Sequence, residues 1–281
     1  MAPIGLEILR DVTPARWLVR SQDLEVFKDT PCNDAWWSTA RPTWKYDKHS
    51  AYLACASSVR GGVGEYVYEL CPSLVMFLDS QYPAGLWYVQ HLDYRVGIAD
   101  GYDGPGWYYS PLLRLWSQQG AVPILTVGYY WPETVRFLSP FYEALRSLRC
   151  ENEEACKWLY RRTFGMLAHK PDRTWRGMIY LPDIWNGLRA ELKARMYYHA
   201  WQVWLKEHQQ PVWLHVDELG YGQRVTSLRL GDTPGTFRER CHEKQPCYAT
   251  GCTEAGIYEL DMVYWCSHHY SRYKERGATI E

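Results

Sequence analysis

The sequence lacks the long apolar runs that mark membrane and secreted proteins. No stretch of its 281 residues approaches 18 consecutive apolar positions, so we expect no membrane-spanning helix. The N-terminal segment MAPIGLEILRDVTPAR has no continuous apolar core of the kind found in signal peptides. We also find no internal repeat and no low-complexity tract. These absences favour a cytoplasmic globular protein, and the 47% hydrophobic and 22% charged composition agrees.

A strong charge of one sign is also missing. The formal net charge is -1 and the pI is about 6.8, whereas nucleic-acid-binding proteins usually carry a basic excess. The near-neutral charge therefore counts against nucleic acid unless Lys and Arg gather on one face. Local basic clusters do occur, at residues 160–162, 188–195 and 238–244.

Phenylalanine is scarce, with 6 Phe beside 15 Trp and 23 Tyr, and Tyr and Trp suit both core packing and ligand stacking. The 9 cysteines are odd in number and follow no signal peptide, so we expect mostly reduced thiols. Near the C-terminus, Cys241, Cys247, Cys252 and Cys266 lie close to histidines, although their spacing is loose for a zinc site. Free thiols and a zinc ion that braces a small C-terminal region both remain open.

The order of the predicted elements indicates an α+β fold. Residues 44–56 read as a strand that runs into a helix. Strand-like segments occupy 63–70, 122–131, 177–183 and 212–221, and the Gly- and Pro-rich segment 100–111 is expected to be a loop. Helical periodicity covers 111–121, 133–168 with a polar break near 151–154, and the amphipathic stretch 185–210.

Acidic residues stand in or beside two of the predicted strands. Asp217 and Glu218 interrupt the strand-forming run HVDELGY, and Asp47 follows the first strand. Taken alone, HVDELGY is also compatible with a β-turn or an exposed edge. Two carboxylates on adjacent strands can hold a pair of Mg²⁺ ions about 3.5–4 Å apart for phosphoryl transfer. Asp47, Asp217 and Glu218 are therefore candidate metal ligands.

A basic helical segment, KWLYRRTFG, lies between these acidic residues in the sequence. Lys157 and Arg161 are four residues apart, so both can point at one ligand, with Arg162 as a third cation. Phe164 and Gly165 close the segment. The segment is either a phosphate-binding helix with an aromatic for base stacking, or a solvated basic face beside a core Phe.

These three segments, in this order, resemble the signatures of family B DNA polymerases, with most likeness to the protein-primed phage and plasmid type. DKHSAY, residues 47–52, fits Asp-x-x-Ser-x-Tyr. KWLYRRTFG, residues 157–165, fits the Lys, the aromatic and the Gly of Lys-x-x-x-Asn-Ser-x-Tyr-Gly. HVDEL, residues 215–219, fits the second Asp of a strand bearing Asp-Thr-Asp. The resemblance covers roughly residues 40–235.

The resemblance implies a polymerase-like palm with an antiparallel sheet, helical fingers and a reduced thumb. Its expected ranges are a leader at 1–40, palm at 41–110 and 185–235, fingers-like elements at 111–184 and a thumb-like region at 236–281. It also implies Mg²⁺ or Mn²⁺ as two ions, DNA primer-template and dNTPs as partners, a possible accessory or priming protein, and a bacterial, phage or plasmid setting. About 40 residues precede Asp47, so no proofreading domain is expected.

The resemblance also implies a role for each matching residue. Asp47 and Asp217 would bind the metal ions, and Lys157 and Arg161 would bind the phosphates, with Arg162 as a further contact. Ser50 and Tyr52 would lie at the substrate, where Tyr52 would pack under the sugar and exclude a 2′-hydroxyl. Phe164 and Gly165 would pack against the nascent base pair.

The sequence departs from the family pattern at three places. Arg161-Arg162 replaces the Asn-Ser pair, Leu53 replaces a Pro, and His215 replaces the first Asp of the third signature. Two alternatives therefore stay open. One is a polymerase-like protein that binds nucleic acid without catalysis, and the other is an unrelated hydrolase with two carboxylates and a Trp-lined cleft.

Overall fold

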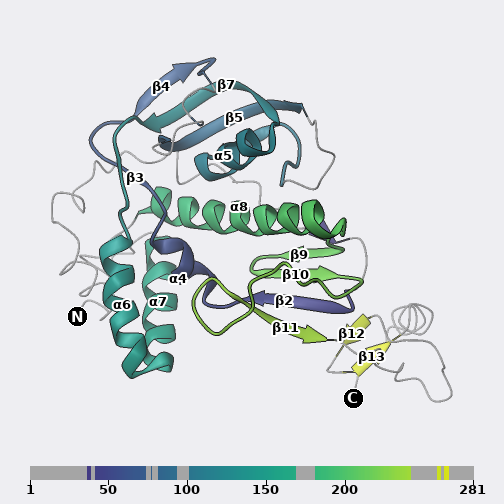
Figure 1. Ribbon diagram of the computed structural model, residues 1–281. Helices are drawn as coiled ribbons and strands as arrows, with labels where there is room; N and C mark the ends of the chain where they lie inside the picture. The colour runs from purple at the N-terminus through teal and green to yellow at the C-terminus, as the bar shows by residue number, and fades with distance from the viewer. Residues whose placement is uncertain are drawn as a thin grey trace, which may run out of the picture.

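The computed structural model describes residues 42–73, 77, 82–93, 101–168 and 181–241, and the backbone of 37–38, 258–260 and 263–265. The described residues form mixed α and β layers stacked around one long helix (Figure 1). The α+β class predicted from the sequence is confirmed.

A five-stranded antiparallel sheet forms the lower layer in Figure 1, in the order β1-β9-β10-β2-β11. Its strands are β1 (Trp37–Ser38), β2 (Trp44–Lys48), β9 (Trp213–His215), β10 (Glu218–Tyr221) and β11 (Phe237–Cys241). The inner strand β2 therefore pairs with two partners that lie far away in the sequence. On one side Asp47 is opposite Glu218, and on the other it is opposite Arg238.

The predicted strand at 212–221 is instead a β-hairpin. β9 and β10 are antiparallel neighbours, and Val216 and Asp217 form the turn between them. Val216 has a φ of 46°, in the left-handed region that β-branched residues rarely adopt. No Gly or Asn marks this turn, which explains why the segment looks like one continuous strand in the sequence.

The long helix α8 (Pro182–Glu207) separates this sheet from the upper layer (Figure 1). Pro182 suits the first turn because its missing N–H has no helical partner there, and the helix ends at His208 in the left-handed conformation. Buried residues occur on more than one side of α8, among them Ile184, Leu188 and Ala190. This is the expected pattern for a helix covered by two layers, and it differs from the single apolar face predicted for 185–210.

The upper layer is a four-stranded sheet in the order β4-β7-β5-β6, covered by α5. Its elements are β4 (Val67–Leu70), β5 (Ala84–Asp93), β6 (Gly106–Tyr109), α5 (Ser110–Gln119) and β7 (Val122–Trp131). The buried Trp87 indole donates to Ser110 Oγ at 2.8 Å, which ties β5 to the start of α5. β6 lies inside the segment 100–111 that was expected to be a loop.

Two helices, α6 (Ser139–Glu151) and α7 (Glu153–Ala168), form an adjacent pair beside α4 (Ala51–Ala56). The predicted polar break is confirmed at Asn152, whose φ and ψ are those of extended backbone. Short pairings complete the structure: β3 (Gly61–Gly62) with β8 (Thr134–Val135), and β12 (Tyr258–Leu260) with β13 (Val263–Trp265).

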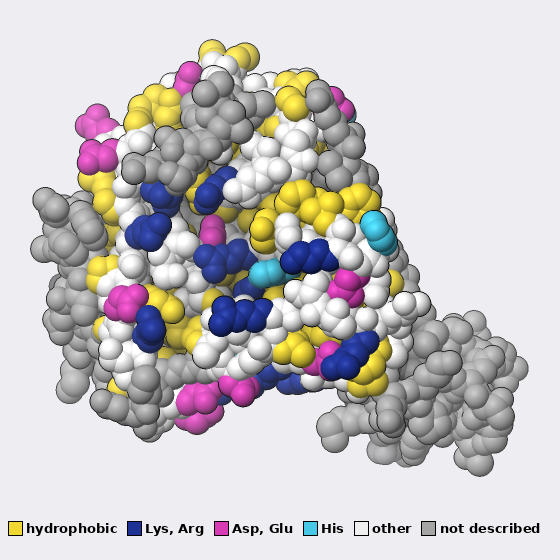
Figure 2. Space-filling view, viewed as in Figure 1, with side chains coloured by type: hydrophobic (Ala, Val, Ile, Leu, Met, Phe, Trp, Pro, Cys, Tyr) yellow, Lys and Arg dark blue, Asp and Glu magenta, His cyan; other side chains and the backbone are white. Residues whose placement is uncertain are grey.

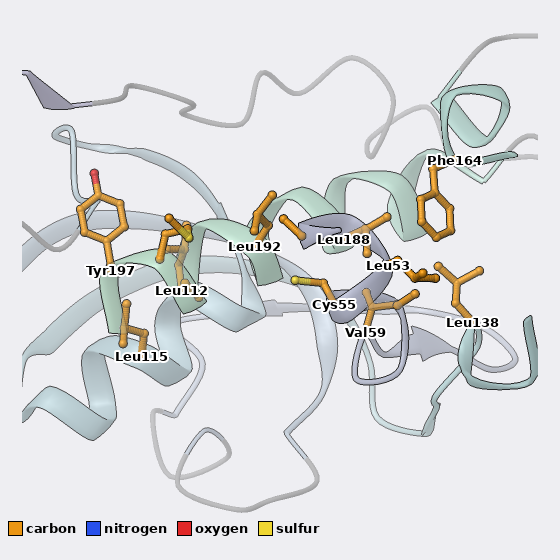
Figure 3. Packing of buried hydrophobic residues seen from close by; sticks show 14 of the residues in the cluster. Leu53, Cys55, Val59, Leu112, Leu115, Leu138, Phe164, Leu188, Leu192 and Tyr197 are labelled. Atoms are coloured by element: carbon orange, nitrogen blue, oxygen red, sulfur yellow. The ribbon is translucent and has the colours of Figure 1, made fainter. Parts of the chain in front are cut away.

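The hydrophobic core runs along α8, with α4 and α7 packed nearer one end of that helix and α5 nearer the other (Figure 3). Leu53 and Cys55 of α4 are fully buried beside Leu188 of α8, and Leu112 of α5 packs nearer the other end of α8. Burial of each such aliphatic side chain stabilises the fold by roughly 1.5–3 kcal/mol. The core therefore holds α4 firmly, and with it the end of β2 that carries Asp47.

The sheet pairing divides the chain differently from the predicted ranges. β5 and β6, placed in the range 41–110, form one sheet with β7, placed in 111–184, and this sheet is separate from that of β2. β11 belongs to the same sheet as β2, although its residues fall in the range predicted to be thumb-like. In the predicted strand 177–183, residues from Pro182 onward are helical, and residues 177–180 lie outside the described residues.

Candidate active site

Asp47 stands at the open face of the five-stranded sheet. Successive side chains of a strand point to opposite faces, and in β2 the neighbours Tyr46 and Lys48 are buried whereas the Asp47 side chain is 32% exposed. The alternation thus turns the carboxylate toward solvent and places apolar packing behind it.

Asp217 lies next to Asp47 because its turn is fastened to the end of β2. The Lys48 N–H donates to the Asp217 carbonyl oxygen at 2.7 Å, and the pair Glu218–Asp47 follows immediately in the ladder. Two carboxylates separated by 170 positions in the chain are thereby brought to one edge of the site. The two carboxylates were expected on adjacent strands, and the structure places Asp47 in β2 and Asp217 in the turn just before its antiparallel neighbour β10.

The negative charge of the Asp47 carboxylate acts on the pKa of Asp217. The pKa of Asp217 is raised above its usual range, first by burial and then by the negative charges of Asp47 and Glu218. Like charges this close disfavour ionisation, Arg240 at 3.8 Å from the Asp47 carboxylate offsets part of that charge, and a bound cation would reverse the effect. The pair is therefore an electrostatically unfavourable arrangement that a divalent cation could relieve.

Glu218 lies on the same face, but it is engaged elsewhere. Its carboxylate forms an ion pair with Lys45 at 3.0 Å, so it would have to leave this cation to become a metal ligand. Within the part of the chain that the structure describes, no group of three or more His, Cys, Asp or Glu is arranged to hold a metal ion. Two carboxylates still fit Mg²⁺, which keeps several waters and takes substrate phosphate oxygens as its other ligands.

Ser50 and Tyr52 follow Asp47 at the start of α4. Ser50 has φ and ψ of 46° and 48°, a left-handed conformation that ends the strand and turns the chain into the helix. The half-buried ring of Tyr52 stacks on Trp185 of α8, with centroids 5.6 Å apart and planes 19° apart. Burial raises the pKa of Tyr52, and the charge of Asp217 adds to the effect, so the phenol lies within the field of the site.

Lys157 is held at the beginning of α7 by carboxylates of its own helix. Its Nζ is 3.2 Å from both Glu153 and Glu154, and these hydrogen bonds raise the pKa of Lys157. Glu153 also contacts His49 Nε2 at 3.6 Å, and His49 lies two residues after Asp47. Lys157 is thus linked to the site through Glu153 and His49 rather than by direct contact with either Asp.

The remaining predicted residues of α7 divide into two groups. Arg161 and Arg162 are exposed, and the Arg162 guanidinium lies over the Trp158 ring at 5.3 Å. Phe164 is 2% exposed and packs against Phe141 of α6 with ring centroids 5.8 Å apart. In this structure Phe164 is a core side chain, which is the alternative that the sequence left open, whereas a Cβ at Gly165 would meet open space.

Strand β11 adds two cations that the sequence analysis did not assign to the site. Arg238 is opposite Asp47 in the ladder, and Arg240 approaches the Asp47 carboxylate at 3.8 Å. Both belong to the basic cluster 238–244 that the sequence shows. Because β11 pairs with β2 over a long sequence separation, the cluster alone gave no sign of this position.

Two further predictions concern parts of the chain away from this site. Of the four cysteines considered for zinc, Cys241 is an exposed free thiol, and Cys247, Cys252 and Cys266 lie outside the described residues. None of the described helices is both long enough and apolar enough to span a bilayer.

Comparison with known proteins finds its matches among solved structures. No protein-family model matches the sequence, and no curated protein does. Phi29 DNA polymerase complexed with single-stranded DNA matches with a TM-score of 0.59 and 12% identity, over 98% of this chain and 61% of that chain. Its ternary complex with primer-template DNA and incoming nucleotide substrates matches with a TM-score of 0.58 and 11% identity, over 83% and 51%.

An orthorhombic crystal form of the same polymerase matches with a TM-score of 0.56 and 13% identity, over 94% of this chain and 57% of that chain. This chain therefore spans little more than half the length of the polymerase chains that it matches. At such low identity the likeness concerns the fold alone. The chain has a polymerase-like α+β fold, similar to that of Phi29 DNA polymerase.

Proposed function

We propose that this protein is a metal-dependent nucleotidyltransferase of the family B type that extends DNA from dNTPs on a template. The observation that carries the proposal is the meeting of Asp47 and Asp217 where β2 reaches the β9–β10 turn. The polymerase-like fold and the three ordered sequence signatures support it. The primer is identified by the extension assay described below.

In this proposal the two carboxylates hold the metal ions. Bound Mg²⁺ would lower the pKa of a primer 3′-hydroxyl and neutralise charge on the leaving pyrophosphate. Asp47 and Asp217 supply the negative oxygens, and the raised pKa of Asp217 means that a cation would bind with release of the electrostatic strain between them.

Other residues of the chain would position the nucleotide. Tyr52, fixed by its stack on Trp185, offers a flat surface beside Asp217 on which a sugar could pack. Arg161 and Arg162 are exposed on α7 and free to approach phosphates, and Lys157 would join them on leaving Glu153 and Glu154. Positioning and electrostatic stabilisation supply most of the rate enhancement in phosphoryl transfer, so loss of these contacts would be expected to slow the reaction.

Primer extension tests the proposal directly. Labelled oligonucleotides are incubated with Mg²⁺ or Mn²⁺, with dNTPs and then rNTPs, with and without template and primer. We expect template-dependent extension by the wild type and its loss in the double variant Asp47→Asn, Asp217→Asn. The matched control is Asp93→Asn, an exposed carboxylate at the end of β5, which should extend like the wild type.

A second candidate function is binding of nucleic acid without synthesis. It is favoured by the ion pairs of Lys157 with Glu153 and Glu154, which occupy the expected phosphate ligand. Wild type that binds primer-template in a mobility-shift assay but extends no better than the double variant would establish this function and overturn the enzymatic one.

A further inference from the structure

A second basic region lies on the opposite face of β2 from the carboxylates. Figure 2 shows Lys and Arg side chains gathered around a His side chain near the middle of the visible face, just below α8. A pocket of about 430 Å³ is lined there by Lys48, Arg195, His199 and Arg229, together with Tyr142 and Tyr198. Its walls come from β2, α6, α8 and the loop that precedes β11.

Lys48 is a buried cation whose hydrogen bonding is incomplete. Its side chain is 3% exposed, and Nζ donates to His199 Nε2 at 2.6 Å and lies 4.7 Å above the Phe237 ring. An ammonium has three N–H donors, and His199 is its one hydrogen-bond acceptor among the described residues.

The rest of the pocket is also positive. Arg195 is balanced by Glu191, at 2.8 Å from its Nε, but Arg229 is exposed and makes no ion pair with any described residue. Among the described residues, no Asp or Glu side chain lines the pocket. Two cations, Lys48 and Arg229, therefore lack an anion, and a buried cation without one is costly.

We propose that this pocket binds the phosphomonoester group of a small molecule, such as a mononucleotide, with Lys48 and Arg229 as its cationic partners. The neutral His199 leaves the remaining Lys48 N–H donors to the ligand, and a guanidinium suits phosphate oxygens in a paired geometry. The volume falls within the ~300–1,000 Å³ range of small-ligand sites and exceeds what a bare phosphate needs. Tyr142 and Tyr198 offer aromatic surface for the organic part.

The pocket is separate from the carboxylate site. Lys48 and Asp47 are consecutive residues of β2 and point to opposite faces of the sheet, and neither Asp47 nor Asp217 lines the pocket. Binding here does not depend on the proposed polymerase activity, so the two proposals can fail independently.

Isothermal titration calorimetry tests the proposal at pH 7 in a phosphate-free buffer that contains EDTA, so that metal-mediated binding at the carboxylates does not contribute. The titrants are dAMP, inorganic phosphate, deoxyadenosine and a single-stranded oligonucleotide without a terminal phosphate. We expect dAMP to bind, inorganic phosphate to compete with it, and deoxyadenosine to show no binding. Lys48→Met keeps the volume of the buried stem without its charge and should weaken dAMP binding about tenfold or more.

Arg229→Gln provides a second test that does not depend on a buried position, because Arg229 is exposed, and it should weaken dAMP binding by a similar factor. Lys206→Met, an exposed lysine on α8, and Asp217→Asn should both bind dAMP like the wild type. Unchanged affinity in Lys48→Met and Arg229→Gln, or no binding of dAMP to the wild type at millimolar concentration, would overturn the proposal. Binding of the oligonucleotide alone would identify backbone phosphodiesters as the ligand and would also overturn it.

Discussion

His199 should make the stability of this protein sensitive to mild acid, and replacing it with Gln should remove that sensitivity. The imidazole of His199 on α8 is half-buried and faces the end of β2, where it accepts a hydrogen bond from the Lys48 ammonium and meets the Phe237 ring edge-on at 5.0 Å. Burial first, and then the charges of Lys48 and Arg195, lower its pKa to about 3 from 6.5. The folded protein therefore holds His199 neutral where the unfolded chain would protonate it.

The sign and the size of the effect follow from proton linkage. Between pH 6.5 and about 3 the unfolded state binds one more proton at this residue than the folded state, so stability falls as the pH is lowered through that window. From pH 7 to pH 5, protonation of His199 in the unfolded chain stabilises the unfolded state by about 2 kcal/mol. This value holds for any folded pKa well below 5. Lys48 stays protonated in both states over this range and cancels.

Urea denaturation followed by Trp fluorescence at pH 7 and pH 5 measures the effect. His199→Gln keeps an acceptor for Lys48 but cannot be protonated, so the loss of unfolding free energy between the two pH values should shrink by about 2 kcal/mol. The quantity compared between variants is the change in unfolding free energy from pH 7 to pH 5, so any pH-independent effect of the substitution on stability cancels. His91→Gln, an exposed histidine of β5, should keep the wild-type loss. Equal losses in the wild type and His199→Gln would show that His199 is protonated in the folded state and would refute the reasoning.

Two more predictions concern the site and the packing. The raised pKa of Asp217 means that folding disfavours its charged form, so the stability of the protein declines as the pH rises above the usual carboxylate pKa. Asp217→Asn should therefore raise the unfolding free energy at pH 7 by about 0.5–2 kcal/mol. A gain that persists at pH 3, where the carboxyl is protonated in both states, would contradict this cause. Gly62→Ala would place a Cβ 1.9 Å from Cγ of the buried Trp131, and urea denaturation should show a loss of about 3 kcal/mol in unfolding free energy. Gly64→Ala is the control: its Cβ meets no neighbouring atom, so at a φ of 75° it should lose only roughly 1 kcal/mol through backbone strain.

The local elements could be predicted where sequence signals coincide with them. Helical periodicity was expected over 111–121, and α5 ends where Gly120 adopts the left-handed conformation, with a φ of 78°, that closes the helix. The strand 122–131 was predicted with the bounds that β7 has, and the break between α6 and α7 falls in the expected polar stretch. These features depend on neighbours in the sequence, which is why periodicity and Gly or Pro positions reveal them.

Features that depend on distant partners were not visible. The turn at Val216 and Asp217 carries no Gly or Asn, so the sequence left a β-turn and a continuous strand as alternatives, and the pairing of β10 with both β9 and β2 shows the turn. The sequence around Phe164 is the same whether its ring stacks on a ligand or packs in the core, and only its contact with Phe141 of α6 shows that it packs in the core. The two sides of α8 are likewise set by what covers them.

The sequence by itself determined the chemical groups available to the site: Asp47 after a strand, Asp217 and Glu218 after a long helix, and a basic cluster at 238–244. Only the tertiary structure decided which of them meet. In the structure Asp217 lies beside Asp47, Glu218 pairs with Lys45, and Arg240 approaches Asp47. Lys48 points to the opposite face of the sheet, where it lines a second basic pocket. The physical reason is that strand pairing joins residues nearly two hundred positions apart, and local propensity carries no information about which distant strand completes a ladder.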